Sequence, residues 1–198
     1  TRKKVLLVHS YHSDYEWTHG INKGVVETFG ARTEENGKVN DAKSQVKIKI
    51  FYMDTKKNNS EAAMKKSALG AKQVIDSWEP DVVITSDDNA ARYLIVPYFK
   101  NRSLAFVFCG VNWDAQEYGF PCSNVTGMIE VQLIDQILNT LKPYAKGKRI
   151  AFLKGDDEAK AAKIYYALRL GFLHQMANYS ETPTSTSKKA LRAAKSKA

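Results

Sequence analysis

The sequence is poor in several features that would each assign a protein class. It has only two cysteines, Cys109 and Cys122, in 198 residues, which is too few for a disulfide scaffold. They flank one predicted loop, so a single bridge in an oxidising compartment and two free thiols in a reducing one both fit.

No apolar run is long enough to span a bilayer, which argues against an integral membrane protein. No leader is visible, because the chain opens on Thr1-Arg2-Lys3-Lys4 and enters a strand directly. That start fits a cytoplasmic protein or a mature protein whose leader has been removed.

Catalytic motifs are missing as well. The stretch "GARTEENGK" has six residues between Gly30 and Gly37, whereas a phosphate-binding loop has four, and no G-x-S-x-G elbow occurs. His9 and His12 could form half of a metal site, but no further ligand follows at a suitable spacing. Cys109 has no identifiable histidine partner that would make it a nucleophile. The sequence therefore predicts a protein that is not an enzyme and that uses no cofactor and no metal.

The chain has an excess of positive charge, with a formal net charge of +9. Such a balance can indicate a nucleic-acid partner. Much of the excess, however, sits in the C-terminal stretch "SKKALRAAKSKA", which has no acidic residue, and the other lysines are scattered singly. We therefore expect a solvated basic surface and no nucleic-acid partner.

What the sequence does contain is an alternation of apolar strands and amphipathic helices. The expected strands are Lys4–His9, Gln45–Tyr52, Asp81–Thr85, Leu104–Cys109, Val125–Glu130 and Arg149–Leu153. The expected helices are Thr18–Phe29, Ser60–Trp78, Asp87–Phe99 with an end or kink at Pro97, Gln132–Leu141 and Asp157–Met176. The polar segment 30–44 is expected to be a loop.

This alternation predicts an α/β fold with a doubly wound parallel sheet. The strands are nearly continuous in Val, Ile, Leu and Phe, which indicates that both faces of the sheet are covered. We expect one complete N-terminal lobe in residues 1–127. A crossover and part of a second lobe are expected in 128–180, followed by a polar tail in 181–198.

Polar and aromatic side chains follow every strand of the predicted first lobe. In an open parallel sheet, ligands bind outside the carboxyl ends of the strands, so these loops predict a binding site at one edge. The residues in question are Ser10, Tyr11, His12, Tyr15 and Trp17 after the first strand, Met53, Asp54 and Thr55 after the second, Ser86, Asp87, Asp88 and Asn89 after the third, and Gly110, Val111, Asn112 and Trp113 after the fourth.

These side chains can recognise a small polar solute. Ser86 and a helix start near Asp88 can hold an anionic group, and Asp54, Asp87 or Asp88 can pair with an ammonium group. The alternative for Asp87 and Asp88 is that they only cap the helix. Aromatic side chains suited to cover an apolar body are Tyr11, Tyr15, Trp17 and Trp113.

Five stretches in order, "VLLVHSYHSDYEWTHGINKGV", "FYMDTK", "PDVVITSDDNAARYLIVPYF", "FVFCGVN" and "SNVTGMIE", resemble the ABC-type transporter periplasmic substrate-binding protein family. This group has the type I periplasmic-binding-protein fold and includes tryptophan-binding members. The same module resembles the extracytoplasmic sensor domains that precede histidine kinases and diguanylate cyclases. The resemblance covers about residues 3 to 177, which is one complete lobe plus part of a second.

The resemblance implies a periplasmic or lipid-anchored protein that binds a small solute, such as an amino acid, between two lobes. It implies an ABC permease as partner, or a signalling domain in the sensor alternative, and it implies no catalysis. A hinge is expected near Gly127. A cytoplasmic α/β enzyme remains the alternative from another class, but it would need a glycine loop where this chain has "HSYHSDYEW". Carried onto this chain, the ligand contacts of the family fall on Ser10, Tyr11, Trp17, Asp54, Ser86, Asp87, Asn89 and Asn112, with Met128 or Glu130 at the crossover.

Overall fold

The computed structural model describes residues 2–34, 37–131 and 133–144. The chain forms two compact units, 1–132 and 133–198. In the second unit the described part is helix α4 (Ile134–Leu141) and the short 3-10 helix η3 (Lys142–Tyr144). The strand expected at 149–153, the helix expected at 157–176 and the tail 181–198 lie outside the described residues. Within the described part, no helix is long and apolar enough to cross a membrane.

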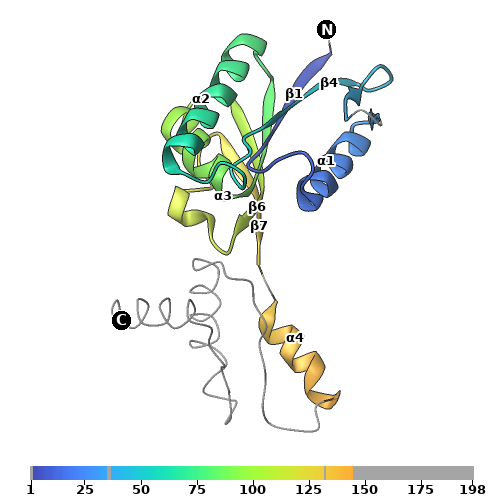
Figure 1. The fold of residues 1–198 in the computed structure, drawn as a ribbon, viewed down its shortest axis with the longest axis vertical. Helices are drawn as coiled ribbons and strands as arrows, with labels where there is room; N and C mark the ends of the chain where they lie inside the picture. The colour runs from blue at the N-terminus through green and yellow to red at the C-terminus, as the bar shows by residue number, and fades with distance from the viewer. Residues whose placement is uncertain (1, 35–36, 132, 145–198) are drawn as a thin grey trace. The chain divides into compact units, whose positions relative to one another are not determined.

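The first unit is built on a five-stranded parallel sheet (Figure 1). Its strand order is β4-β1-β5-β6-β7, so the first strand along the chain lies inside the sheet and later strands are added on either side of it. This order is the doubly wound arrangement, which confirms the predicted fold class. The strands are β1 (Lys3–His9), β4 (Val46–Tyr52), β5 (Val82–Ser86), β6 (Ala105–Asn112) and β7 (Val125–Glu130).

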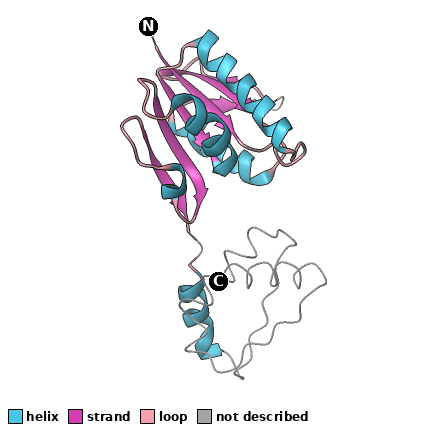
Figure 2. Cartoon of the chain, turned by 90° about the vertical axis from the view of Figure 1, so that its left-hand side faces the viewer, coloured by secondary structure: helices cyan, strands magenta, loops and turns pink. Residues whose placement is uncertain are grey.

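Helices lie on both faces of this sheet (Figures 1 and 2). Helix α1 (Glu16–Thr28) covers one face, and α2 (Glu61–Trp78) covers the other together with α3 (Asp87–Ala90) and the π-helix η1 (Ala91–Phe99). Helix α2 begins where the sequence predicts, because the Ser60 side chain accepts a hydrogen bond from the Ala63 N–H and caps it.

The main apolar core lies between the sheet and the α2–η1 layer. It includes Leu6 and Val8 from β1, Leu94 and Ile95 from η1, and Phe106 from β6, all at most 1% exposed. The opposite face is less completely covered, because α1 packs near β1 while β6 and β7 lie farther along the sheet. Two apolar side chains on this face of the two strands, Val107 and Met128, are accordingly 38% and 70% exposed.

Local structure differs from the sequence prediction in three places. The helix that was expected to end or kink at Pro97 continues to Phe99, because the wider π-helical turn accommodates the proline. Strand β6 runs three residues beyond Cys109, through a bulge between Phe108 and Val111. The loops expected at 30–44 and 110–124 contain a small hairpin, β2 (Arg32–Thr33) with β3 (Val39–Asn40), and a 3-10 helix, η2 (Ala115–Tyr118).

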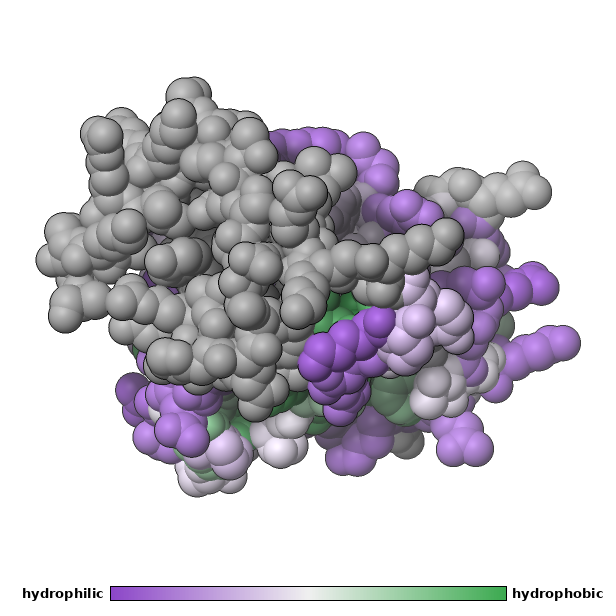
Figure 3. Space-filling model, turned by 90° about the horizontal axis from the view of Figure 1, so that it is seen from below, coloured by the Kyte–Doolittle hydropathy of each residue, from purple (hydrophilic) through white to green (hydrophobic). Residues whose placement is uncertain are grey.

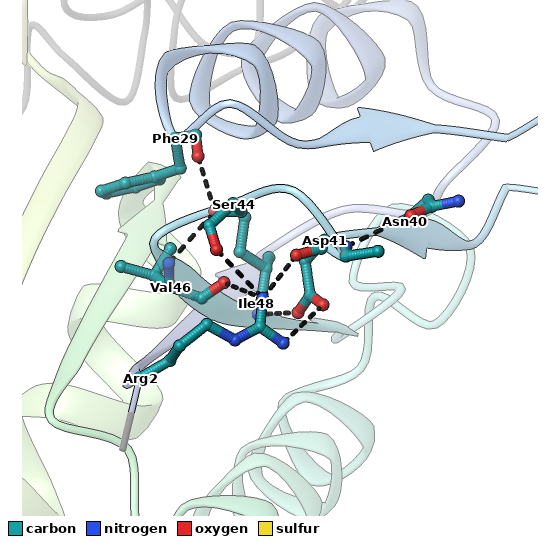
Figure 4. A network of polar contacts seen from close by, with 8 residues as sticks. Arg2, Phe29, Asn40, Asp41, Ser44, Val46 and Ile48 are labelled. Carbon is teal, nitrogen blue, oxygen red and sulfur yellow. Dashed lines mark hydrogen bonds and ion pairs between the residues drawn. The ribbon is translucent and has the colours of Figure 1, made fainter.

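A polar network fixes the approach to the edge strand β4 (Figure 4). The Arg2 guanidinium donates to the backbone carbonyls of Asp41, Ser44 and Val46 and pairs with the Asp41 carboxylate at 3.1 Å. The other Asp41 oxygen accepts the Ile48 N–H, 2.9 Å away. A single arginine next to the start of β1 therefore holds the segment that leads into β4.

Gly127 on β7 offers a test of this packing. A Cβ at this position would lie 2.1 Å from the Phe108 carbonyl oxygen and 2.6 Å from its ring. We expect Gly127→Ala to lower the free energy of unfolding by about 1–3 kcal/mol, because the strand backbone must shift. Urea denaturation followed by circular dichroism measures this change.

The matched control for Gly127→Ala is Gly24→Ala, since nothing lies within 4 Å of the position where a Cβ would be placed in this helical glycine. We expect this second change to raise stability by about 0.5–1 kcal/mol through reduced backbone freedom. Equal effects of the two substitutions would contradict the close packing of β7 on β6.

Candidate functional site

The candidate site lies where β1 and β5 end side by side. These two strands are neighbours in the sheet, and the chain winds away from them in opposite directions along it. Such a reversal leaves a crevice at the carboxyl ends of the strands, which is where ligands bind in folds of this class. Several of the predicted site residues follow β1, β4, β5 and β6 at this edge.

Ser10 ties the strand ends together. Its hydroxyl donates to the Ser86 carbonyl at 2.5 Å and accepts the Ala90 N–H at 2.9 Å. Its own carbonyl accepts both the N–H and the hydroxyl of Thr55, at 3.0 and 2.6 Å. Thr55 in turn accepts the Asn89 side-chain amide at 2.8 Å. The predicted residues Ser10, Ser86 and Asn89 are thus brought together, with Thr55 joining them from β4.

Asp87 is the charged group at the centre of the site. Only 3% of the residue is exposed. Its Oδ1 accepts the Trp17 indole N–H at 3.0 Å, whereas the buried Oδ2 has no hydrogen-bond partner among the described residues. Burial raises the pKa of this carboxyl to about 7. A buried carboxylate oxygen without a donor is costly, so this atom is a candidate contact for a ligand donor.

The backbone around Asp87 is strained. Its φ is +67°, and left-handed values also occur at Asp54 (+54°) and Trp113 (+63°), which follow β4 and β6. Gly110 in the β6 bulge has φ +69°, and a Cβ there would lie 3.3 Å from Asp87 Oδ1 and 3.5 Å from the Trp17 ring. Three non-glycine residues in this conformation at neighbouring strand ends are typical of functional sites.

A second acidic residue, Asp88, braces the loop after β6. Its carboxylate accepts hydrogen bonds from the Asn112 side-chain amide and from the Tyr118 hydroxyl, the latter at 2.9 Å. Arg92 donates to the same hydroxyl at 3.2 Å. Among the described contacts the Asp88 carboxylate accepts no helix N–H and instead holds the predicted contact Asn112.

Tyr11 and Tyr15 form the aromatic wall of the site. Their rings meet edge to face with centroids 5.4 Å apart, and the Lys56 ammonium lies 4.5 Å and 4.6 Å from the two centroids. The pKa of Tyr11 is raised, chiefly by burial and further by the charges of Asp87 and Asp88. Tyr11 follows Ser10, whose hydroxyl bonds the residue before Asp87, so this wall begins beside the acidic residues.

A hollow of about 640 Å³ opens beside this wall, at the start of α1. Its lining residues are Tyr15, Glu16, Trp17, Gly20 and Ile21. In the view of Figure 3, the coloured surface that is not hidden by grey atoms shows hydrophobic patches among hydrophilic side chains. Trp17 is 42% exposed, so its ring is available both to this hollow and to Asp87.

The side chains considered for catalysis, His9 and Cys109, are largely buried and have contacts within the fold. His9 is buried, stacks on Tyr52 and bonds to the Ser86 hydroxyl at 3.0 Å, and burial lowers its pKa to about 4. Burial raises the pKa of Cys109 to about 11, which leaves the thiol protonated and a poor nucleophile. Cys109 and Cys122 are both free. Within residues 2–34, 37–131 and 133–144, no three His, Cys, Asp or Glu side chains gather as a metal site.

Two predicted contacts stand apart from the hydrogen-bonded cluster. Asp54 lies at the end of β4, where its carbonyl accepts the Lys57 and Asn58 N–H groups and closes a turn. Glu130 is the last residue of β7, paired in register with Asn112, and its charge contributes to the raised pKa values of Tyr11 and Asp87. Both remain predictions as ligand contacts.

The prediction from sequence missed Lys56 and Tyr118, and it named Thr55 without assigning it a role. The position of Thr55 directly after Asp54 was a usable signal, because both residues follow β4 at this edge of the sheet. The contact of Tyr118 with Asp88 joins segments 30 residues apart, and no local pattern indicates it.

The raised pKa of Asp87 predicts a pH-dependent stability. A carboxyl whose pKa rises from 3.8 to about 7 on folding contributes stability that is fully present below pH 3.8 and is lost as pH rises through about 7. Asn cannot ionise, so the Asp87→Asn variant does not lose this stability. Between pH 5 and 7 we expect its free energy of unfolding, relative to that of the wild type, to rise by up to about 1.4 kcal/mol per pH unit. Urea denaturation at a series of pH values measures this difference.

Trp17→Phe is the companion variant for that experiment. It keeps an apolar ring beside Asp87 but removes the indole N–H that stabilises the ionised carboxyl. Without this donor the pKa of Asp87 should rise further, so we expect the loss of stability with rising pH to extend to higher pH in this variant than in the wild type. A stability difference between Asp87→Asn and wild type that stays constant from pH 5 to 8 would contradict the assignment.

Comparison with known proteins gives matches at the level of structure. No family model matches the sequence, and no curated protein matches it. Among solved structures, a conserved domain protein from Vibrio cholerae O1 biovar El Tor aligns with a TM-score of 0.63 at 18% identity, over 98% of this chain and 61% of that one.

Two further matches carry descriptions of binding. An ABC domain in complex with L-Trp from Streptococcus pneumoniae aligns with a TM-score of 0.59 at 17% identity, over 100% of this chain and 63% of its own. The ligand-free, open structure of a substrate-binding protein with adhesive properties from Clostridium difficile aligns with a TM-score of 0.58 at 18% identity, over 98% and 61%.

The chain thus spans less than two thirds of the length of the solved structures that it matches. At 17–18% identity these matches concern the fold. They agree with the five-stranded doubly wound sheet described above. The described first unit therefore has the α/β fold of one lobe of a substrate-binding protein.

Proposed function

We propose that this chain is part of an extracytoplasmic substrate-binding protein that binds an amino acid and delivers it to an ABC importer. The observation that carries the proposal is the buried Asp87 carboxylate, which has one oxygen paired with Trp17 and the other without a donor. A protonated amine supplies the missing donor and the compensating charge. The fold shared with substrate-binding proteins supports a binding role.

The surroundings of Asp87 support a ligand with an apolar or aromatic body. Tyr11, Tyr15 and Trp17 line the same edge, and such rings bind flat apolar groups. Oδ2 is buried in the structure, so the groups that cover it must shift for an amine to reach it. The structural match that contains L-Trp makes L-tryptophan the first ligand to try.

Alternative functions are less well supported by the same residues. A nucleotide-handling enzyme needs close backbone approach to phosphates after the first strand, where this chain places Tyr11 and Tyr15. A sensing module would use the same site for the same kind of ligand. The titration described next tests the binding on which both the transport and the sensing functions depend.

The chain contains its own reporter for a binding experiment. Trp17 donates its indole N–H to Asp87, whereas Trp78 lies at the opposite, amino-terminal end of the strands, where it contacts Lys4 and Lys49. In ¹⁵N-labelled protein titrated with L-tryptophan, we expect the Trp17 indole resonance to shift in a saturable manner. We expect the Trp78 resonance to stay in place.

Asp87→Asn is the variant that tests the role of the carboxylate in this titration. We expect it to weaken binding at least about tenfold, because the ammonium loses its countercharge. Saturable binding of L-tryptophan that leaves the Trp17 resonance unchanged would place the ligand elsewhere. No binding of L-tryptophan or of any other standard amino acid would contradict the proposed function.

The affinity for an amino acid should depend on pH. Asp87 ionises around pH 7, and only the ionised form offers a charge to the amine. We therefore expect the dissociation constant to fall by up to about tenfold between pH 6 and pH 8, measured by the same titration at each pH. The Asp87→Asn variant should show a flat profile, and a wild-type profile without slope would argue against the Asp87–amine contact.

A further inference from the structure

Lys56 is not held in place by an ion pair with any described residue. Its ammonium lies over the rings of Tyr11 and Tyr15, at 4.5 and 4.6 Å from their centroids. No carboxylate of the described residues lies within 4.0 Å of it, although its neighbour Lys57 pairs with Asp14 at 2.9 Å. Lys56 therefore presents a full positive charge, held by two aromatic faces, at the edge of the candidate site.

The backbone that carries Lys56 is fixed. The preceding residue, Thr55, is buried and bonded to Ser10 through both its N–H and its hydroxyl. The following residue, Lys57, donates its N–H to the Asp54 carbonyl at 3.1 Å, a contact that does not involve its side chain. Lys56 is exposed, but its backbone is held and its ammonium rests on two rings, which lowers the entropic cost of binding an anion relative to a lysine without such contacts.

Charges of the opposite sign lie on the other side of Tyr11. Tyr11 follows Ser10 and Asp87 follows Ser86, and the Ser10 hydroxyl joins these two strand ends at 2.5 Å, so the acidic residues begin beside Tyr11. Burial chiefly, and then the charges of Asp87, Asp88 and Glu130, raise the pKa of the Tyr11 hydroxyl. Lys56 lies over the face of the same ring. The site therefore has a positive end and a negative end separated by one aromatic side chain, which matches the charge distribution of a zwitterion.

The other donors expected to receive an anion are already in use. The Ser86 hydroxyl bonds to His9, and the Ala90 N–H at the start of the helix donates to Ser10. A ligand carboxylate would also meet the negative charges of Asp87 and Asp88 there. Lys56 is thus the cation at this edge that is free of an ion pair within the described part of the chain.

We propose that Lys56 is the specificity-determining residue that binds the carboxylate of a zwitterionic ligand, while the acidic side of the site receives its ammonium group. This assignment rests on the proposed function, since it names the chemical form of the ligand. It selects free amino acids over amines, amides and esters, which lack the carboxylate. The two tyrosines hold the ammonium in place before the ligand arrives.

The test compares L-tryptophan with L-tryptophanamide, which keeps the amine and the ring but has no carboxylate. Both are titrated into the full chain, wild type and Lys56→Met, with the Trp17 indole resonance as readout. We expect Lys56→Met to raise the dissociation constant of L-tryptophan about tenfold. The dissociation constant of L-tryptophanamide should change by no more than about twofold. Lys56→Arg, which keeps the charge, should restore most of the preference for the acid.

Lys57→Met is the matched control, because this adjacent lysine is tied to Asp14 and faces no ligand group in the proposal. We expect it to change both affinities by about twofold or less. Equal losses for the acid and the amide in Lys56→Met, or tighter binding of the amide, would overturn the assignment of Lys56 and leave the proposed function intact. Absence of binding by any amino acid in the wild type would overturn the proposed function and this assignment together.

Discussion

The site depends on the contacts of one buried serine. Ser10 ends β1, and through its hydroxyl and carbonyl it holds the last residue of β5, the start of the helix that follows, and the turn after β4. Each of these groups is a main-chain or hydroxyl group that would be costly to leave without a partner in the interior. One residue thus joins the end of β1 to two segments that are distant from it in sequence, 86–90 and the turn at Thr55. The positions of Asp87, Asn89 and Lys56 follow from it.

On this frame the chain places groups that reduce its stability. Asp87 is buried with one oxygen unpaired, and three residues at neighbouring strand ends adopt left-handed backbone conformations. Natural proteins keep such features mainly where a ligand compensates them. The stable frame and the strained groups are complementary, because the network around Ser10 and Asp88 holds the strained segments in one conformation.

Much of the fold could be predicted from the sequence. The strands around Leu6, Val83 and Phe106 are continuous apolar runs that only a sheet covered on both faces can bury, and Ser60 marks the start of α2 by local capping chemistry. The π-helix across Pro97 could not be foreseen, because it depends on the packing of Leu94 and Ile95 rather than on local preference.

The sequence predicted where in the fold the candidate site lies, but not which contacts its side chains make. Parallel strands bring their carboxyl ends to one edge, so Ser10, Asp87 and Asn112 were expected near each other. Which oxygen faces which donor is decided by contacts between distant segments, such as Trp17 with Asp87 and Tyr118 with Asp88. A sequence of this kind indicates no such pairing, and Lys56 is one lysine among many until the rings beneath it are seen.

The incompletely covered face of β6 and β7 has a consequence for handling the protein. Val107 and Met128 expose apolar surface there, and such surface favours contact between copies. The formal net charge of +9 keeps copies apart by mutual repulsion. Salt weakens that repulsion, since the screening length falls to about 8 Å at physiological ionic strength. The colloidal stability of this chain is therefore a balance between charge and an apolar strip, and added salt shifts it toward association.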